Sequence, residues 1–554
     1  MAITIYTAPA LLLAIGWLIY GWLYNWRLRK HTHIPQFYPR SFLWGHLDTI
    51  GIAIKKLDDP LRHPDYAFYN LWKDAGCPQI MFFDLRPVTP PMTLIVSHDV
   101  AEQVSRITKM HPWSVTKSPT MQDLIGIVGE KSILLLEGEN WKNLRRRFNA
   151  GFAPQHLVTL LPVIIQKANI FVDKLDALAT SGAEAELEPL CTNLTFDIMG
   201  EIVCNLDLKA QDDSTGGHEI VHYFRKVLET YHGVTQLVPS FTDIVKKIER
   251  RYYANKADVA IKKCVKESFA GIKAAQETGQ KNSQNRSVLS LALKDSDELT
   301  NEDLQIAADQ VKTFFFAGHD TTSILLQRLF HELSRNPKCL AAIRAEHKAV
   351  LGDGDPRDAL LANPDHTMNQ LTYTSACIKE TLRLWPPAGS ARMPNPGKGF
   401  KVRQEDGSEV LVDQTVLYIC HFITHRDPKV YGDTADDFVP ERWLGNTSTA
   451  AADEGVETSE NKIPVSAWRP FERGPRNCIG QELANLEARV ILACVIRRFD
   501  FIKVGAGAVV LDEKGDPIVD EQGRYKTNGD LFNAQVITSK PFDKCRMKVR
   551  RAKE

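Results

Sequence analysis

One cysteine stands in a segment whose neighbours are suited to stabilising a thiolate. The segment extends from Phe471 to Gly480 with the spacing Phe-x-x-Gly-x-Arg-x-Cys-x-Gly, and an apolar, helix-like run over 481–495 follows it. Glycine permits tight turns and close backbone approach, and helix N-termini and nearby cations stabilise anions. The pattern predicts a loop that presents Cys478 as a thiolate beside a flat partner. A buried structural cysteine in a Gly/Pro turn is the competing interpretation.

A second candidate site is an acid followed by an alcohol, Asp320-Thr321, within a long apolar helix pattern. The pattern runs from Thr300, which fits an N-cap, to about residue 334. Gly318 lies in its middle, where glycine costs about 1 kcal/mol relative to alanine. Close approach of a ligand could offset that cost, and so could a tight helix–helix contact. The Thr321 hydroxyl can bond to the preceding turn, and an acid–alcohol pair can relay protons.

Two further pairs have helical spacing. Trp141 and Arg145 lie four residues apart and share one helix face, where an indole N–H and a guanidinium suit a carboxylate; a solvated basic face is the alternative.

Glu380 and Arg383 lie three residues apart among apolar residues, which predicts a partly buried ion pair that needs further partners. The segment 438–443, which contains Pro-Glu-Arg, can supply one.

Together these motifs resemble the cytochrome P450 haem-thiolate monooxygenases of the microsomal type, and the chain is similar to fungal members. The resemblance implies a mainly α fold with a small β-rich lobe, preceded by one N-terminal transmembrane helix. Cys478 is implied to be the axial ligand of the iron of haem b, in a loop that includes Phe471 and Gly480. The residues implied to hold the haem propionates are Trp141, Arg145, Arg392 and Arg476.

The resemblance also implies roles in proton delivery, in support of the cysteine loop and in docking of a redox partner. Asp320 and Thr321 correspond to the family's proton-delivery pair. Glu380 and Arg383, completed by an arginine of the Pro-Glu-Arg segment, are implied to brace the cysteine loop rather than to act in catalysis. Lys142, Arg146 and Arg147 resemble part of a basic face that docks an acidic redox partner.

The implied activity is insertion of one oxygen atom of O2 into a lipophilic small molecule, by hydroxylation, epoxidation or desaturation. Electrons would come from NADPH through a reductase, with cytochrome b5 as a second donor, and a role in secondary metabolite biosynthesis is expected. An apolar pocket is predicted from residues 110–127, 314–321 and 388–391, with the turn at 529–532 reaching it. Two alternatives remain: a haem-thiolate isomerase that needs no reductase, and a non-catalytic haem sensor.

The start of the chain has the composition of a membrane anchor. Residues 1–26 carry no charged side chain, and Arg27, Arg29 and Lys30 follow at once. This length can span a bilayer, and the basic cluster favours a cytosolic body. We therefore expect an anchor over 1–26, a basic, proline-containing hinge over 27–50, and a catalytic domain over 51–554. The expected location is the endoplasmic reticulum membrane, single-pass, with the catalytic domain in the cytosol.

Bulk composition excludes other classes. The chain has 554 residues, with 68 Lys+Arg against 68 Asp+Glu, so the formal net charge is zero. No global basic field indicates nucleic acid binding. The 10 cysteines contain no Cys-x-x-Cys pair and are read as reduced thiols rather than as a disulfide framework.

Overall fold

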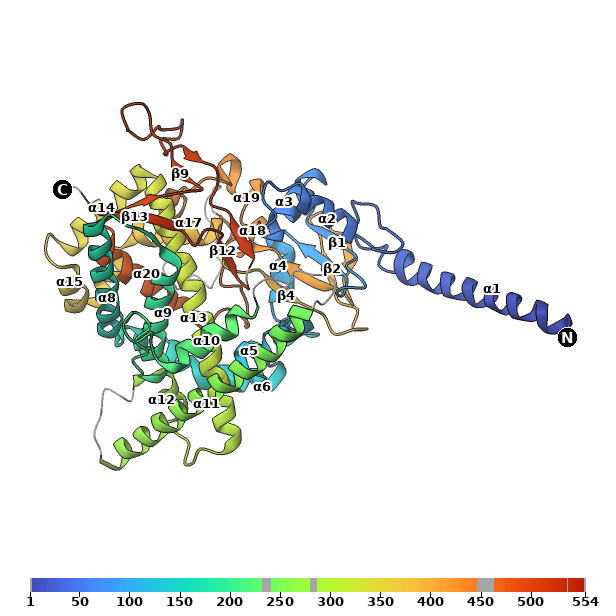
Figure 1. The fold of residues 1–554 in the computed structure, drawn as a ribbon, viewed down its shortest axis with the longest axis horizontal. Helices are drawn as coiled ribbons and strands as arrows, with labels where there is room; N and C mark the ends of the chain where they lie inside the picture. The colour runs from blue at the N-terminus through green and yellow to red at the C-terminus, as the bar shows by residue number, and fades with distance from the viewer. Residues whose placement is uncertain (1, 232–240, 279–285, 446–462, 536, 553–554) are drawn as a thin grey trace.

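A computed structural model describes residues 2–231, 241–278, 286–445, 463–535 and 537–552. Figure 1 shows a large helical body, a smaller lobe that contains most of the N-terminal strands, and one helix, α1 (Ala2–Tyr24), that extends away from that lobe. The predicted mainly α architecture with a small β-rich lobe is confirmed within this part of the chain.

The β-rich lobe is built on a four-stranded sheet in the order β1-β2-β7-β4. Its strands are β1 (Ile80–Phe83), β2 (Met92–Ile95), β7 (Val416–Ile419) and β4 (Ser390–Arg392). β1 pairs antiparallel with β2, and β2 pairs parallel with β7. Every residue of β1 and β2 is buried, because helices and loops cover both faces and apolar runs can therefore be continuous rather than alternating. The two strands predicted over residues 80–100 are thus confirmed.

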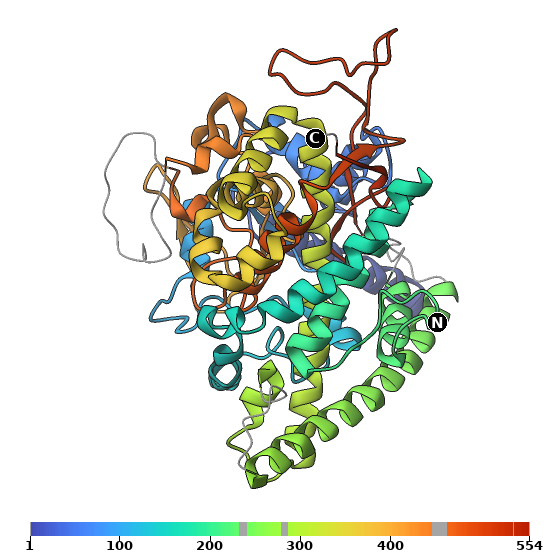
Figure 2. The ribbon, with the colours of Figure 1, turned by 90° about the vertical axis from the view of Figure 1, so that its left-hand side faces the viewer.

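The centre of the helical body is α13 (Asn301–Arg335), which runs through its middle in Figure 2. Its N-cap is Thr300, whose Oγ1 accepts a hydrogen bond from the backbone N–H of Asp303 at 3.1 Å. The predicted cap and helix length are therefore correct. α13 is almost wholly buried and packs along α9 (Leu187–Cys204). This burial explains why the middle of its sequence contains few polar residues.

Two helices place the other motifs against α13. They are α17 (Thr372–Leu384), which carries Glu380 and Arg383, and α20 (Gln481–Val495), which begins directly after Gly480. The other helices are α2 (Leu47–Lys55), α3 (Pro64–Asp74), α4 (His98–Ser105), α5 (Ile125–Val128), α6 (Gly138–Asn149), α7 (Pro154–Val158), α8 (Leu161–Ser181), α10 (Glu219–Glu229), α11 (Phe241–Thr278), α12 (Val288–Leu293), α14 (Pro337–Leu351), α15 (Pro356–Ala362), α16 (Pro364–Gln370), α18 (His421–Thr424) and α19 (Pro428–Tyr431).

Small sheets close the C-terminal part of the chain. One of them, ordered β3-β13-β8, joins the last strand of the described residues, β13, to β8 and to β3, which lies far earlier in the sequence. The remaining strands are β3 (Glu184–Glu186), β5 (Lys401–Arg403), β6 (Glu409–Leu411), β8 (Phe499–Lys503), β9 (Ala508–Val509), β10 (Thr527–Asn528), β11 (Asn533–Gln535), β12 (Ser539–Pro541) and β13 (Arg546–Arg551). β11 and β12 form an antiparallel hairpin.

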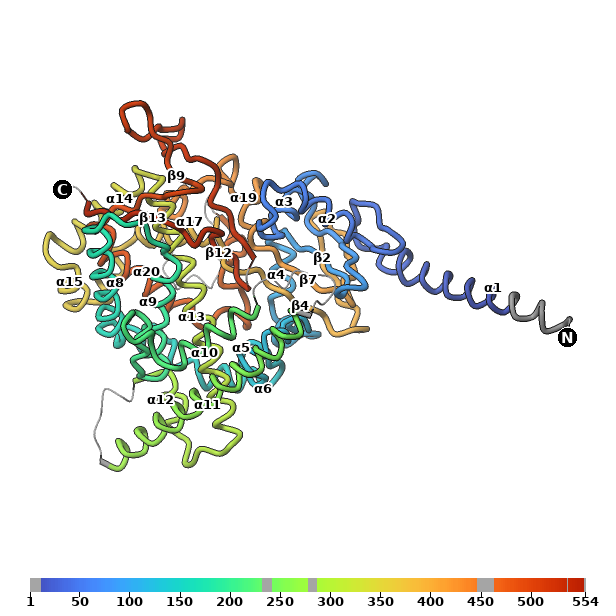
Figure 3. The backbone as a smooth tube through the Cα atoms, in the orientation of Figure 1, coloured from blue at the N-terminus to red at the C-terminus, as the bar shows by residue number. Residues whose placement is uncertain are grey.

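The N-terminal helix and the segment after it differ in part from the expectation. α1 is prolonged by a π-helical turn, Asn25–Arg29, and the chain becomes extended at Lys30, so the helix ends inside the predicted hinge (Figure 3). Arg27 is buried and ion-paired with Asp84 at 3.0 Å; it is not part of an exposed basic cluster. Within the described part of the chain, no single helix is long and apolar enough to cross a bilayer, although a pair bent by 75°, Gly138–Val158 with Leu161–Ser181, meets the requirements of length and composition together. The transmembrane anchor thus stays a prediction.

Candidate functional site

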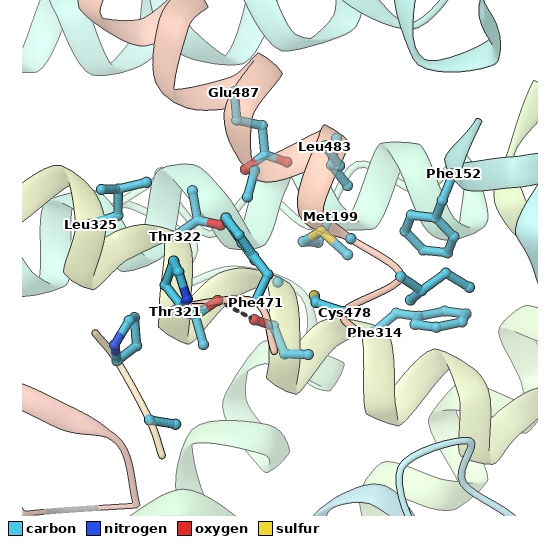
Figure 4. A pocket seen from close by; sticks show the side chains of 18 of the residues that line it. Phe152, Met199, Phe314, Thr321, Thr322, Leu325, Phe471, Cys478, Leu483 and Glu487 are labelled. Atoms are coloured by element: carbon cyan, nitrogen blue, oxygen red, sulfur yellow. Dashed lines mark hydrogen bonds between the residues drawn. The ribbon is translucent and has the colours of Figure 1, made fainter. Parts of the chain in front are cut away.

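A cavity lies between α13 and the cysteine loop, with Cys478 on one side and Thr321 on the other (Figure 4). Most of its wall is apolar. The lining residues are Phe152, Met199, Phe314, Ala317, Gly318, Thr321, Thr322, Leu325, Leu382, Pro387, Ala388, Pro470, Phe471, Cys478, Ile479, Gly480, Leu483, Ala484 and Glu487. Three predicted site residues of the loop, Phe471, Cys478 and Gly480, are therefore brought together with Thr321. Residues 110–127 and the turn at 529–532, which were expected in the pocket, do not line this cavity.

The cysteine loop depends on a glycine that no other residue can replace without strain. Gly474 has φ +73°, and a Cβ added there would lie 2.1 Å from the backbone oxygen of Ser105. The backbone N–H of Cys478 donates to the Phe471 carbonyl at 2.9 Å, which folds the loop back on itself. Gly480 is the N-cap residue of α20. The loop therefore presents the Cys478 thiol at a helix start, as predicted.

Opposing influences act on the pKa of the Cys478 thiol. Burial raises the pKa of the thiol above its ordinary value, although the Gly480 N–H, the Arg145 guanidinium and the Lys117 ammonium each act to lower it. Burial outweighs these three groups because an apolar surrounding disfavours the charged form. A coordinated metal ion would favour the thiolate form, because it deprotonates a thiol outright.

The two members of the acid–alcohol pair point in different directions. Thr321 Oγ1 donates to the Ala317 carbonyl at 2.7 Å, one turn earlier, as its position predicts. The Asp320 side chain, in contrast, does not line the cavity. Its carboxylate lies 2.6 Å from Lys540 Nζ and accepts a hydrogen bond from Thr538 Oγ1 at 2.5 Å. Burial alone would raise the pKa of Asp320, but Lys540 holds it below its usual value.

Gly318 is explained by helix packing as much as by the cavity. A Cβ at this position would lie 2.3 Å from Met199 Sδ on α9. The tight helix–helix contact is thus realised, although Gly318 also lines the cavity. Both explanations for a glycine at this point of α13 hold.

A group of buried cations lies together beside the loop. Arg392 is 0% exposed, and its Nη2 has no hydrogen-bond partner among the described residues. Arg476 pairs with Glu137 at 3.0 Å and stacks on the Trp141 ring at 4.6 Å. Burial, Arg392 and Arg476 lower the pKa of Lys117 well below its ordinary value. An unpartnered guanidinium nitrogen and a destabilised ammonium both favour an added anion, so this group fits haem propionates.

Arg145 is oriented toward the cysteine loop. Its Nη1 donates to the Asn477 carbonyl at 2.8 Å and its Nη2 to Asn477 Oδ1 at 3.0 Å. Trp141, in contrast, contacts Arg476. Of the four predicted propionate ligands, Trp141, Arg392 and Arg476 therefore lie near one another, while Arg145 secures the residue that precedes Cys478.

The predicted Glu380–Arg383 pair is the centre of a buried network. Two hydrogen bonds join them, at 2.9 and 2.8 Å, and both side chains are 0% exposed. Arg442 lies 3.0 Å from Glu380, as predicted for the Pro-Glu-Arg segment, and the Trp443 indole donates to Glu380 at 2.9 Å. Arg383 also donates to the His425 carbonyl at 2.8 Å. The pair is thus satisfied on every side and has a structural role.

Sequence reasoning missed three residues. Lys117 joins the cation group through a backbone bridge to Arg392, and Lys540 pairs with Asp320, which lies far earlier in the sequence. Glu487 lines the cavity, and neither of its carboxyl oxygens has a partner among the described residues; burial raises its pKa to about 8. Only Glu487 carried a signal, namely a carboxylate on the buried face of an apolar helix pattern.

Comparison with known proteins is consistent with this geometry. A family model described as Cytochrome P450 matches residues 79–524. The cytochrome P450 monooxygenase acrF of Aspergillus aculeatus is 33% identical over 494 residues, which cover 86% of this chain and 95% of that protein. The cytochrome P450 monooxygenase polC of Polytolypa hystricis is 26% identical over 487 residues, or 83% of this chain and 80% of that protein.

Solved structures share the fold. The heme domain of cytochrome P450DA superposes with a TM-score of 0.69 at 18% identity, covering 94% of this chain and 97% of that one. The cytochrome P450 CYP102L1 gives a TM-score of 0.66 at 18% identity, covering 88% and 98%. At this identity the similarity concerns the fold alone.

Proposed function

Because the chain belongs to the cytochrome P450 family and is a member of its monooxygenases, we propose that it inserts one oxygen atom of O2 into a lipophilic small molecule. The proposed cofactor is haem b, with electrons from NADPH delivered by a reductase. The observation that carries the proposal is the placement of Cys478 and Thr321 on opposite sides of one cavity. A role in secondary metabolite biosynthesis is proposed by analogy with the fungal relatives.

The residues of the chain have separable tasks around such a haem. Cys478 would ligate the iron, and Arg392, Arg476 and Lys117 would hold the propionates. Bound in this way, a haem thiolate supplies activation of O2. Thr321 holds a hydroxyl on the opposite wall for hydrogen bonding, and the apolar wall excludes water and accepts a lipophilic ligand.

Electron delivery is proposed to occur at the surface nearest Cys478. A groove beside it is lined by Arg145, Asn149, Phe152, Asn477, Cys478, Ile479, Gln481 and Glu482. Of the three predicted docking residues on α6, Arg146 is exposed. The Lys142 side chain is 43% exposed, although it pairs with Glu139 at 3.6 Å, whereas the Arg147 side chain is 28% exposed and pairs with Asp303 at 3.3 Å. We therefore assign the docking of an acidic reductase, or of cytochrome b5, to Lys142 and Arg146 and not to Arg147.

Attachment to the endoplasmic reticulum membrane is proposed for the N-terminal segment, with the body in the cytosol. The support is the uncharged sequence of 1–26 and the direction of α1, which leaves the body in Figures 1 and 3. Leu12 and Trp17 on it are exposed, as are Arg29 and Lys30 after it. Fractionation of full-length protein and of a variant that lacks residues 1–26 tests this: the variant should leave the membrane fraction.

The core of the proposal is tested by spectroscopy of the reduced, CO-bound protein. We expect the strongly red-shifted Soret band of a thiolate-ligated haem, and we expect Cys478→Ser to abolish it. Thr321→Ala should keep the band, because Thr321 is on the opposite wall, and should raise the peroxide released per NADPH consumed. Folded native protein without the band would refute haem-thiolate ligation. Turnover that is independent of NADPH and reductase would indicate an isomerase instead.

A further inference from the structure

Two buried cysteines from separate helices lie in contact in the helical body. Cys204 is the last residue of α9 and Cys264 lies within α11, and their exposed fractions are 5% and 7%. Both are free thiols, and the Cys204 thiol shares a hydrogen bond with the Cys264 thiol. Two sulfur atoms within hydrogen-bond reach, carried by different elements, are close to the arrangement that a disulfide requires.

The shared hydrogen bond makes the two thiols chemically unequal. It is the largest influence on both, and it raises the pKa of Cys204 well above its ordinary value, with burial acting in the same direction. The same bond lowers the pKa of Cys264 below its ordinary value, against the effect of burial. Cys204 is therefore the S–H donor, and its bond stabilises the Cys264 thiolate. Because the thiolate is the nucleophile, Cys264 is the member of the pair that reacts first.

The other cysteines of the chain do not share this property, and all ten lie within the described residues. Burial raises the pKa of every cysteine outside the pair, namely Cys77, Cys191, Cys339, Cys377, Cys420, Cys478, Cys494 and Cys545. Cys191 and Cys545 are also neighbours, and Cys545 raises the pKa of Cys191 further. Proximity of two thiols therefore does not activate either of them; the hydrogen bond from Cys204 does.

We propose that Cys204 and Cys264 are a redox modification site at which hydrogen peroxide forms a reversible disulfide. The Cys264 thiolate attacks one oxygen of peroxide and the O–O bond breaks, which gives a sulfenic acid and a hydroxide that takes up the proton released by Cys264. The Cys204 sulfur then attacks the sulfenic sulfur, the S–O bond breaks, and the hydroxyl leaves as water with the Cys204 proton. Overall, 2 RSH + H2O2 gives RSSR + 2 H2O, and a dithiol reverses the reaction. This inference goes beyond the proposed function and does not depend on it.

The disulfide would fasten α9 to α11 around α10. α10 lies between Cys204 and Cys264 in the sequence and packs against α11. Its Phe224 ring contacts the Phe196 ring of α9 at 5.7 Å and the His319 ring of α13 at 5.8 Å. Closing the loop between residues 204 and 264 constrains the unfolded chain more than the folded one. We therefore expect the midpoint of thermal unfolding to rise by about 4 °C.

The competing explanation is that both thiols are small apolar core residues, the usual role of a buried cysteine. Both side chains belong to the main hydrophobic core of the helical body, and a buried structural thiol is inert. Core packing alone predicts that the two thiols stay reduced as long as the protein is folded. The two explanations thus differ in one measurable quantity, the covalent state of Cys204 and Cys264 in folded protein.

The experiment treats the full-length, haem-loaded protein with hydrogen peroxide in the absence of reductant, below its unfolding temperature. Free thiols are then alkylated in denaturant, and the digest is analysed by mass spectrometry. We expect a cross-linked peptide that joins Cys204 and Cys264, a loss of about 2 Da from the intact chain, and the raised unfolding midpoint. Dithiothreitol should reverse all three. Cys204→Ala should leave Cys264 as a sulfenic acid that dimedone traps, whereas Cys264→Ala should leave Cys204 unmodified.

Cys191 and Cys545 are the matched control. They are buried neighbours, on α9 and just before β13, and burial raises the pKa of both, so they should stay reduced at the peroxide dose that joins Cys204 to Cys264. If Cys204 and Cys264 stay reduced in folded protein, or are oxidised no faster than the control pair, the inference is overturned and core packing remains. Failure of the proposed function is distinct, since the native protein would then lack the thiolate Soret band whatever the state of these thiols.

Discussion

Replacement of Arg383 by alanine should disturb the cysteine loop from a distance. Arg383 makes two hydrogen bonds to Glu380, at 2.9 and 2.8 Å, and both side chains are 0% exposed. It also donates to the carbonyls of His425 and Asp437, each at 2.8 Å. The His425 ring accepts the backbone N–H of Arg469 at 3.0 Å, so the network leads directly to the segment before the loop.

The expected cost follows from what the substitution leaves behind. Breaking a buried ion pair by removing one partner costs roughly 3–5 kcal/mol. Glu380 keeps Arg442 at 3.0 Å and the Trp443 indole at 2.9 Å, which limits the electrostatic part. The freed carbonyls add about 1–3 kcal/mol if no water reaches them. We therefore expect Arg383→Ala to lower the free energy of unfolding by about 4 kcal/mol.

The assay is denaturant unfolding followed by tryptophan fluorescence and by the Soret band of the reduced, CO-bound protein. Both transitions should shift to lower denaturant, and the Soret transition should precede the fluorescence transition, because part of the protein should lose the thiolate band before it unfolds. Lys348→Ala is the control, because its pair with Asp353 is 72% and 86% exposed and such pairs contribute little. A loss below about 1 kcal/mol with an intact thiolate band would refute the argument that this network braces the loop.

Two other predictions concern the cavity wall and the loop. Because burial raises the pKa of Glu487 to about 8, the folded protein retains a proton that the unfolded chain releases, so the free energy of unfolding should fall as pH rises from about 4.5 to about 8. Glu487→Gln should flatten that fall, and an unchanged slope in calorimetric scans over this range would contradict the assignment. Gly474→Ala should abolish haem incorporation, measured by Soret absorbance, because its Cβ meets the Ser105 backbone; Gly397→Ala has a similar φ, +76°, with no atom within 4 Å and should incorporate haem normally.

Short-range patterns in the sequence were sufficient for the principal motifs. The Thr300 cap and the Glu380–Arg383 pair involve residues three apart, and helix geometry alone brings such residues together. The cysteine loop is likewise local: its glycines and the helix that follows determine where Cys478 points. These features could be predicted because the physical interactions that define them lie within one or two helical turns.

Contacts between distant segments could not be predicted in this way. Lys540 meets Asp320 only because β12 packs against α13, and no periodicity in the sequence relates the two. The sequence placed Asp320 beside Thr321 and implied a shared direction, but the Lys540 ammonium draws the carboxylate away from the cavity. Arg27, which lies beside Arg29 and Lys30 in the sequence, is buried for a similar reason, since it pairs with Asp84 on the sheet lobe.

The sequence by itself determined which residue types carry chemistry and in which helices and loops they stand, because those choices depend on local spacing and backbone conformation. The tertiary structure alone decided their ionisation and their direction. Burial raises the pKa of the Cys478 thiol and that of Glu487, because desolvation depends on every element that packs around a group.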